Sequence, residues 1–227
     1  VKDTHYHSVI RRTLLTNTDW NLIRACPAPL LLARPGEWRE PPRFLAALDP
    51  GHLGDKPASL DHDILDAAEV RAAFDGKNLD TVVDATARGD ADDEFYPTAM
   101  ANIIAGAKAG NVQQIILHGS VGAGKNIELF PQANFGRMRS TLAAKGRAEQ
   151  LLIDSGIGYT IIRNGILLSA DLPPTRTARL STDQRLMRKV TRTDLGILTV
   201  KCVGNPDYMN GIWHAIDDSL DVPPQYR

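Results

Sequence analysis

The regular alternation of short apolar runs with longer helical segments is the feature that most constrains the fold of this chain. Runs such as 114–118 and 159–163 are apolar on both faces, which is typical of strands in a sheet that helices cover on both sides. Each is preceded or followed by a segment with apolar residues at helical spacing, as in 97–109. This order predicts an α/β fold with a doubly wound, mostly parallel sheet and helices on both faces.

The same patterns predict where the individual elements lie. We expect residues 30–33 and 44–48 to form strands in the same sheet as residues 81–85, since both runs have the length of a strand. The remaining strands are expected at 114–118, 159–163 and 211–216, and the helices at 9–25, 58–74, 97–109, 139–155 and 193–203.

Composition excludes several classes of protein. The chain has 227 residues, of which 43% are hydrophobic, so it can bury a full core, and its net charge of −1 gives no reason to expect a nucleic-acid partner. No apolar run approaches the roughly 20 residues that span a bilayer, which predicts no membrane partner. Cys26 and Cys202 lie far apart and the histidines have no metal-ligand spacing, so we expect a reduced, cytoplasmic protein without a metal site.

Residues 118–126, HGSVGAGKN, match the G-x-x-x-x-G-K phosphate loop of nucleotide triphosphatases. Such a loop must open a helix, and a Ser or Thr hydroxyl after the Lys must hold Mg²⁺. Here Asn126 stands in the hydroxyl position, and Pro131 and Gly136 interrupt any helical period that follows. We therefore interpret the match as fortuitous.

From about Asp63 to its C-terminus the chain resembles the short-chain dehydrogenase/reductase superfamily, and within it the atypical, NmrA-like, NAD(P)H-binding branch. The resemblance covers roughly 160 residues and implies a Rossmann-like sheet that binds NAD or NADP. It rests on the order and spacing of six short segments: 63–66 (DILD), 80–86 (DTVVDAT), 115–122 (IILHGSVG), 145–149 (KGRAE), 155–165 (SGIGYTIIRNG) and 190–195 (VTRTDL).

The resemblance implies roles for residues at the ends of the expected strands. Ser120 and Lys145 match the catalytic positions, where Ser120 would polarise a carbonyl and Lys145 would hold the nicotinamide ribose. Arg163 and Asn164 match the positions that shape the substrate pocket. Cofactor contacts are implied for Ser120 and Lys145 and, in addition, for Asp84, Thr86, Ala87, Arg88 and Gly119.

Each of these residues also has an ordinary structural interpretation. Ser120 is favoured in turns, Lys145 suits the exposed side of a helix, and Asp84 can cap the turn after its strand. Arg163 can belong to a structural ion pair. The basic run from Arg176 to Arg192 lacks the interleaved aromatic residues of a base-stacking surface, and we expect a solvated loop there, with Asp194 placed by the following helix N-terminus.

One catalytic residue of the superfamily is missing. Active members carry a Tyr general acid four residues before the Lys, and here that position holds Thr141, whose hydroxyl is far too weak an acid. Hydride transfer and a non-catalytic role as a nucleotide sensor are therefore both open.

The first ~68 residues resemble a different family, the universal stress proteins. Residues 11–34 are similar to the last helix and strand of that family, and residues 43–49 to the first strand of a second unit. The chain thus looks chimeric. We expect residues 1–42 to form a stress-protein-like helix, strand and linker, and residues 43–227 to form the NAD(P)-binding domain.

The change of family removes the segment that would carry the glycine motif for the pyrophosphate. Gly51 and Gly54 keep a G-x-x-G spacing in the replacement, but Pro57 stands where a third glycine would be. An ATP or AMP binder of the stress-protein type, using Asp49 and the Gly51–Gly54 turn, and a chimera without retained activity are therefore further alternatives. In each active case the partner is a small-molecule nucleotide. The sequence leaves open whether the protein forms a homodimer.

Overall fold

A six-stranded, mostly parallel sheet forms the centre of the protein. The structure is a computed structural model that describes residues 44–47, 63–76, 78–87, 94–169 and 172–222. The expected strand at 30–33 and the expected helix at 9–25 lie outside these residues. The strand order is β1-β2-β3-β4-β8-β6, with β6 antiparallel to β8 and all other neighbours parallel. The strands are β1 (Phe44–Ala47), β2 (Thr81–Asp84), β3 (Gln114–Ser120), β4 (Gly158–Asn164), β8 (Gly211–Ile216) and β6 (Arg179–Ser181).

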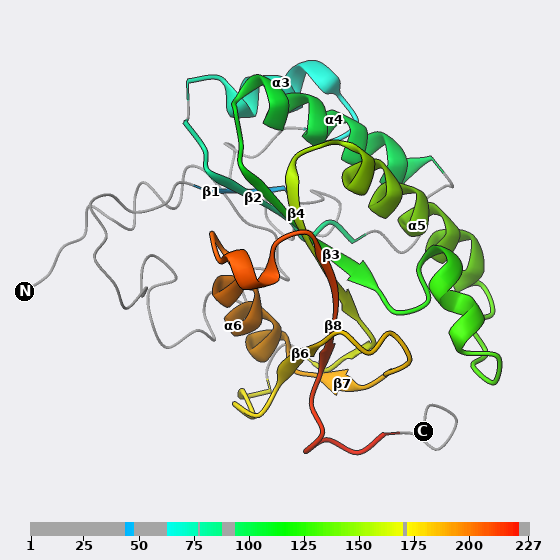
Figure 1. The fold of residues 1–227 in the computed structure, drawn as a ribbon. Coiled ribbons are helices and arrows are strands. Elements are labelled where there is room, and N and C mark those ends of the chain that lie inside the picture. Colours follow the sequence, from blue (N-terminus) through cyan, green and yellow to red (C-terminus); the bar gives the residue numbers. More distant parts are fainter. Residues whose placement is uncertain (1–43, 48–62, 77, 88–93, 170–171, 223–227) are drawn as a thin grey trace, which may run out of the picture.

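Helices cover both faces of this sheet, which confirms the predicted fold class. Helices α3 (Ala67–Phe74), α4 (Phe95–Ala109) and α5 (Met138–Asp154) lie on one face, and α6 (Arg192–Cys202) lies on the other (Figure 1). Neighbouring residues of β3 alternate between the two layers, as the pleat requires: Ile115 packs with α4 and α5, and Ile116 packs with α6. No helix in the described ranges is long and apolar enough to cross a bilayer.

Pairing of β1 with β2 confirms that residues 44–47 join the sheet that contains residues 81–84. The pairs run in parallel from Phe44–Thr81 to Ala47–Asp84. The sheet is thus continuous across the junction between the two resembled families.

Two predicted boundaries were wrong. The helix expected at 58–74 begins, within the described residues, only at Ala67, because the Asp66 carboxylate accepts hydrogen bonds from the backbone N–H groups of Ala68 and Glu69 and so caps it there. Strand β3 was expected to end at His118 but continues through Gly119 to Ser120, since it pairs with β4 along its whole length, up to Asn164.

The segment after β4 contains strands that the sequence did not predict. Two-residue strands β5 (Ile166–Leu167) and β7 (Lys189–Val190) form a small parallel sheet of their own. The solvated loop expected across the basic run was therefore wrong for Arg179 in β6 and Lys189 in β7. Their pairing partners, β8 and β5, lie in other segments of the chain, and periodicity within the run carries no information about them.

The loop after β3 is shaped by packing against α5. Residues Gly124–Leu129 form a 3₁₀ helix, η2, rather than a full α-helix, and Lys125 is exposed. Asn126 is buried and its side chain is used internally: it accepts from the N–H of Gly122 at 2.7 Å and donates to the carbonyl of Gln184 at 3.0 Å. This geometry agrees with the interpretation of the phosphate-loop match as fortuitous.

We predict that Gly146→Ala destabilises the fold. A Cβ at Gly146 in α5 would lie 2.3 Å from the Cα of Gly124, and backbone at that distance cannot move aside as a side chain can. Overpacking of this kind typically costs about 1–3 kcal/mol. The measurement is the free energy of unfolding in urea. Gly110→Ala is the control, because a Cβ there meets its nearest neighbours at an ordinary 3.4 Å; equal stabilities of the two variants would contradict this account.

Candidate functional site

Polar residues gather where β2, β3 and β4 end. Asp84 is the last residue of β2, and Ser120 and Asn164 are the last residues of β3 and β4 and lie opposite each other in the register. Because parallel strands present their carboxyl ends at one edge, three of the predicted residues meet there, where open α/β sheets bind their ligands.

Lys145 reaches this edge from α5. Its Nζ donates a hydrogen bond to Ser120 Oγ at 3.0 Å, and the same ammonium lies 4.9 Å from the centre of the Tyr96 ring. The structure thus brings together the two residues to which the sequence assigned catalysis. Tyr96, at the start of α4, was not among the predicted residues.

Burial changes the proton affinity of the groups around Lys145. It lowers the pKa of Lys145, and the negative charges of Asp84 and Glu149 oppose that effect. It also raises the pKa of Asp84, while hydrogen bonds from Thr86 and the charge of Lys145 counteract the rise. The site therefore holds opposite charges in a water-poor environment, where their interaction is strong.

The turn after β2 is set by its own aspartate. Asp84 Oδ1 accepts a hydrogen bond from the backbone N–H of Thr86 at 2.9 Å, which is the capping role that the sequence left open for Asp84. Thr86 is buried and Ala87 is exposed. Gly51, Gly54 and Arg88 lie outside the described residues.

Arg163 belongs to a buried ion pair. Its guanidinium donates to the Glu149 carboxylate, with Nη2 2.6 Å from Oε2, and Nη1 donates to Gln184 Oε1 at 3.0 Å. Burial raises the pKa of Glu149, and the hydrogen bonds and charge of Arg163 oppose this. These contacts favour the structural interpretation of Arg163 over the role in the substrate pocket.

The same carboxylate explains the glycine before Ser120. A Cβ at Gly119 would lie 2.5 Å from Glu149 Oε1. Any larger residue at position 119 would therefore have to displace the Glu149 carboxylate from its place beneath the site.

Asn164 has an unused acceptor. Its side-chain nitrogen Nδ2 lies 3.4 Å from the backbone carbonyl of Gly119. Its backbone carbonyl accepts a hydrogen bond from the N–H of Val121 at 2.9 Å. Its side-chain Oδ1 is buried and has no hydrogen-bond partner among the described residues. Buried acceptors are rarely left unpaired, so this atom is suited to a ligand that brings a donor.

A pocket opens between β2, β3, α4 and α5. Of its polar residues, Tyr96, His118 and Glu149 were not among the predicted site residues. Glu149 follows Lys145 at the i, i+4 spacing that places both on one helix face, which is a signal that could have identified it. The lining residues are Asp84, Thr86, Tyr96, Ala99, Leu117, His118, Gly119, Lys145, Ala148 and Glu149.

His118 is held neutral behind the site. Thr199 Oγ1 donates to the carbonyl of Leu195, so it accepts from His118 Nε2 at 2.8 Å. Burial, and to a lesser degree the charge of Lys145, lowers the pKa of His118 to about 4. His118 is therefore an uncharged structural donor near neutral pH.

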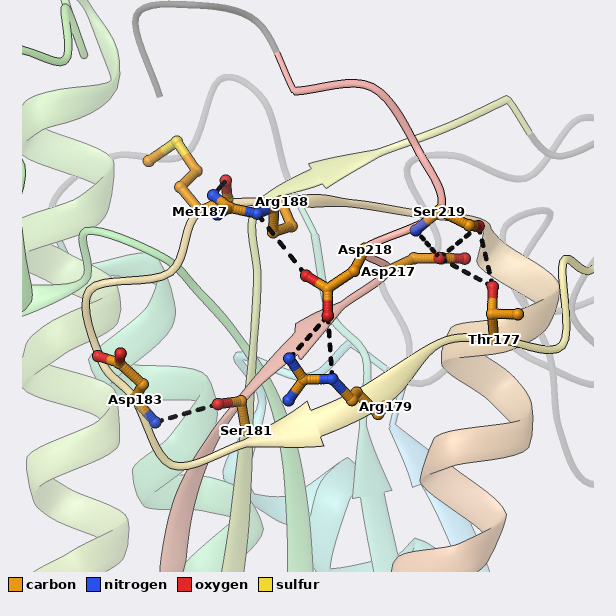
Figure 2. A network of polar contacts seen from close by, with 9 residues as sticks. All are labelled: Thr177, Arg179, Ser181, Asp183, Met187, Arg188, Asp217, Asp218 and Ser219. Carbon is orange, nitrogen blue, oxygen red and sulfur yellow. Dashed lines mark hydrogen bonds and ion pairs between the residues drawn. The ribbon is translucent and has the colours of Figure 1, made fainter. Parts of the chain in front are cut away.

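Two arginines of the basic run interact with the carboxylate of Asp218, which follows β8. Arg179 Nη2 donates to Asp218 Oδ2 at 2.7 Å, and Arg188 Nε lies 3.9 Å from Asp218 Oδ1 (Figure 2). The neighbouring Asp217 accepts from Thr177 Oγ1 and from the backbone N–H of Ser219, each at 2.9 Å.

Asp194 has a larger role than the sequence suggested. A helix N-terminus was expected to explain it, but the carboxylate is buried and accepts from the backbone N–H groups of Thr175 and Arg176 and from Thr191 Oγ1 at 2.6 Å. It joins the segment before β6 to the start of α6. These partners lie up to 19 residues away, beyond the reach of a local pattern.

Comparison with protein families matches residues 48–206 to a family described as NAD(P)H-binding. Among relatives, an uncharacterized chloroplastic protein of Arabidopsis thaliana is 42% identical over 107 residues, which are 45% of this chain and 32% of that protein. A universal stress protein E homolog of Haemophilus influenzae is 39% identical over 49 residues, 22% of this chain and 16% of that protein. The chain thus spans about a third or less of the length of these relatives.

Solved structures share the fold. An anaerobillin reductase from Escherichia coli O157:H7 superposes with a TM-score of 0.63 at 21% identity, covering 80% of this chain and 87% of that one. An oxidoreductase from Lactococcus lactis gives 0.63 at 14% identity, covering 88% and 86%. A short-chain dehydrogenase/reductase from Veillonella parvula in complex with NADP gives 0.55 at 15% identity, covering 80% and 86%.

We predict that His118 makes the stability of the protein depend on pH. The unfolded chain binds a proton near pH 6.5 and the folded protein only near pH 4, so the contribution is complete above pH 6.5 and is lost as the pH falls toward 4. The loss is roughly 3 kcal/mol, since one pKa unit corresponds to about 1.4 kcal/mol. His118→Gln keeps an N–H donor for Thr199 without titrating, so its unfolding free energy should fall less over this range; parallel curves would contradict the assignment.

We predict that Arg163→Met strongly destabilises the fold, because it leaves the Glu149 carboxylate buried without its partner. Breaking a buried pair in this way costs about 3–5 kcal/mol. The matched control is Arg147→Met on α5, whose pair with Glu94 is exposed and should contribute less than about 1 kcal/mol. Urea unfolding of both variants is the measurement, and similar losses would argue against a special role for the buried pair.

Proposed function

The chain belongs to the NAD(P)H-binding family, and from this premise we propose that it is a reductase whose dinucleotide lies across the carboxyl ends of β2 and β3. Its ligand is accordingly a small-molecule nucleotide. The observation that carries the proposal is the hydrogen bond from Lys145 Nζ to Ser120 Oγ at 3.0 Å, at the edge where such sheets bind ligands.

The residues at this edge suit a nicotinamide cofactor. An ammonium has three donors, and the contact with Ser120 uses one, so Lys145 can also donate to ribose hydroxyls. The unpaired Oδ1 of Asn164 needs a donor of the kind that a carboxamide provides. Asp84, the last residue of β2, and Thr86, two residues further on, line the pocket beside Lys145, and we propose that they contact the adenosine side together with Ala87. Gly51, Gly54 and Arg88 stay predictions for the pyrophosphate and ribose contacts.

Bound NAD(P)H would supply a hydride to an acceptor. The role of Ser120 is to donate a hydrogen bond to the acceptor oxygen, and Lys145 orients the Ser120 hydroxyl and makes it a better donor by lying against its oxygen. As the acceptor is reduced, the Ser120 hydroxyl proton would pass to the acceptor oxygen and Lys145 Nζ would return a proton to Ser120 Oγ, leaving Lys145 neutral; the lowered pKa of Lys145 eases this second transfer. This relay would take the place of the tyrosine that the chain lacks at Thr141.

The preference between NADH and NADPH depends on the groups around the adenosine ribose. A neighbour of the same fold carries NADP, which supports a trial of the phosphorylated form first. Arg88, which follows Ala87 in the sequence, is the residue that we propose to test for a contact with the 2′-phosphate of NADPH. The test compares the affinities of Arg88→Gln for NADH and NADPH.

A nucleotide sensor is the second candidate. It is favoured by one observation: Thr141, on α5 one turn before Lys145, offers no acid for turnover. The two proposals share the binding site and differ in whether an acceptor is reduced.

We predict that the protein binds NADPH or NADH in the micromolar range and that Lys145→Met weakens this binding about tenfold or more, as expected for the loss of a charge-assisted hydrogen bond. Calorimetric titration with NADPH, NADH, ATP and AMP is the measurement. The control is Lys125→Met: Lys125 is exposed in the loop that mimics a phosphate loop and should leave dinucleotide binding unchanged.

Three results would redirect the proposal. Binding of ATP or AMP alone would move the function to the stress-protein-like segment. Loss of binding in Lys125→Met but not in Lys145→Met would move the site to the loop after β3. Dinucleotide binding without reduction of any carbonyl acceptor would favour the sensor.

A further inference from the structure

Tyr96 stands at the start of α4, facing the residues that end β2 and β3. It is 8% exposed, it lines the same pocket as Lys145, and nothing in the sequence pattern singled it out. Phe95 packs its ring edge-on against the Tyr96 ring, with centroids 5.1 Å apart and an angle of 88° between the planes. This contact restricts the orientation of the Tyr96 ring.

Lys145 has two contacts within the described residues. One is the hydrogen bond to Ser120 Oγ at 3.0 Å, and the other is the Tyr96 ring, whose centroid lies 4.9 Å from Nζ. That distance is within the ~6 Å at which the negative face of an aromatic ring attracts a cation. The ion pair of Glu94 with Arg147, at 3.1 Å, ties the start of α4 to α5 close to Lys145 and so supports this contact.

The other charged or titratable groups near Lys145 are engaged elsewhere or are neutral, so they do not hold its ammonium in place of the Tyr96 ring. The Glu149 carboxylate is engaged by three hydrogen bonds from Arg163, and Asp84 Oδ1 accepts from Thr86. His118, on β3, is neutral near pH 7 because its pKa is lowered to about 4. Both carboxylates attract the ammonium through their charge, without a hydrogen bond to Nζ, and the ring centroid lies 4.9 Å from it.

We infer that Tyr96 is a positioning residue of this site, whose ring face holds the Lys145 ammonium against Ser120. The inference rests on the proposed function for its meaning, since a fixed ammonium is what a dinucleotide ribose and the Ser120 hydroxyl require. It does not make Tyr96 an acid, because the face of the ring is the part that meets the ammonium. Tyr96→Phe keeps that ring face and is the reference for the substitutions below.

The test replaces residue 96 by phenylalanine, monofluorophenylalanine and trifluorophenylalanine. These residues have nearly the same shape, so the fold is kept, but each fluorine weakens the negative ring face. Lysines are converted to isotope-labelled dimethyl-lysine, which keeps the charge, and the pKa of Lys145 is followed by NMR without any cofactor. The Lys145 signal is assigned as the one that Lys145→Arg removes.

We predict that the pKa of Lys145 falls stepwise from Tyr96→Phe along the fluorinated series, by about half a unit to one unit in total. The same series at Tyr159, a half-buried tyrosine packed at the edge of the core, is the control and should leave this pKa unmoved. A constant pKa along the residue-96 series, or an equal fall in the residue-159 series, would overturn the inference.

Dinucleotide affinity, measured on the same variants with their lysines unmethylated, separates the two proposals. A stepwise pKa with affinity that declines in parallel, about threefold or more, supports both. A stepwise pKa in a protein that binds no dinucleotide supports the role of Tyr96 and overturns the proposed function instead.

Discussion

Helix α5 lies so close to the loop after β3 that only glycine fits at the point of contact, and the rest of the site depends on this approach. The Cα atoms of Gly146 and Gly124 meet where a side chain would need space. Lys145 is the neighbour of Gly146 in the chain, so the depth at which α5 lies also decides how far the Lys145 ammonium reaches toward Ser120. We expect a larger residue at Gly146 to lift the helix and separate these two groups, because its Cβ would lie 2.3 Å from the backbone of Gly124.

The second constraint is the balance of buried charge that this approach creates. Lys145 and Arg163 bring positive charge and Asp84 and Glu149 bring negative charge to the region between α5 and the sheet. Buried charges are tolerated only when they are paired or hydrogen-bonded. Arg163 satisfies Glu149 fully, while Lys145 keeps donor capacity toward the pocket. One pair therefore supports the structure, and the ammonium beside it stays available to a ligand.

Sequence reasoning reached the fold class and the central residues because both rest on local patterns. Apolar runs located β2, β3, β4 and β8 to within one or two residues, and short motifs brought Ser120 and Lys145 together. Tyr96 was missed because its role arises from a contact between α4 and α5. Glu149 was missed because its partner Arg163 lies in β4, although its spacing of four residues from Lys145 is a local signal. The strands β5, β6 and β7 were missed because their pairing partners lie in other segments of the chain.

The alternatives for Asp84 and Arg163 could be weighed only once their partners were visible. Asp84 caps the turn at Thr86, and Arg163 pairs with Glu149, so both have structural duties at the edge of the site. The division of the chain at residues 42 and 43, and the contribution of Gly51 and Gly54, stay predictions, because they concern residues outside the described ranges.

The central claim is that a nicotinamide dinucleotide lies across the ends of β2 and β3, against Lys145 and Ser120. A crystal structure of the protein grown with NADPH tests it most directly. The account predicts density for the dinucleotide over this edge, with the nicotinamide ribose within hydrogen-bonding distance of Lys145 Nζ. A dinucleotide bound elsewhere, for example on the exposed loop around Lys125, would contradict it.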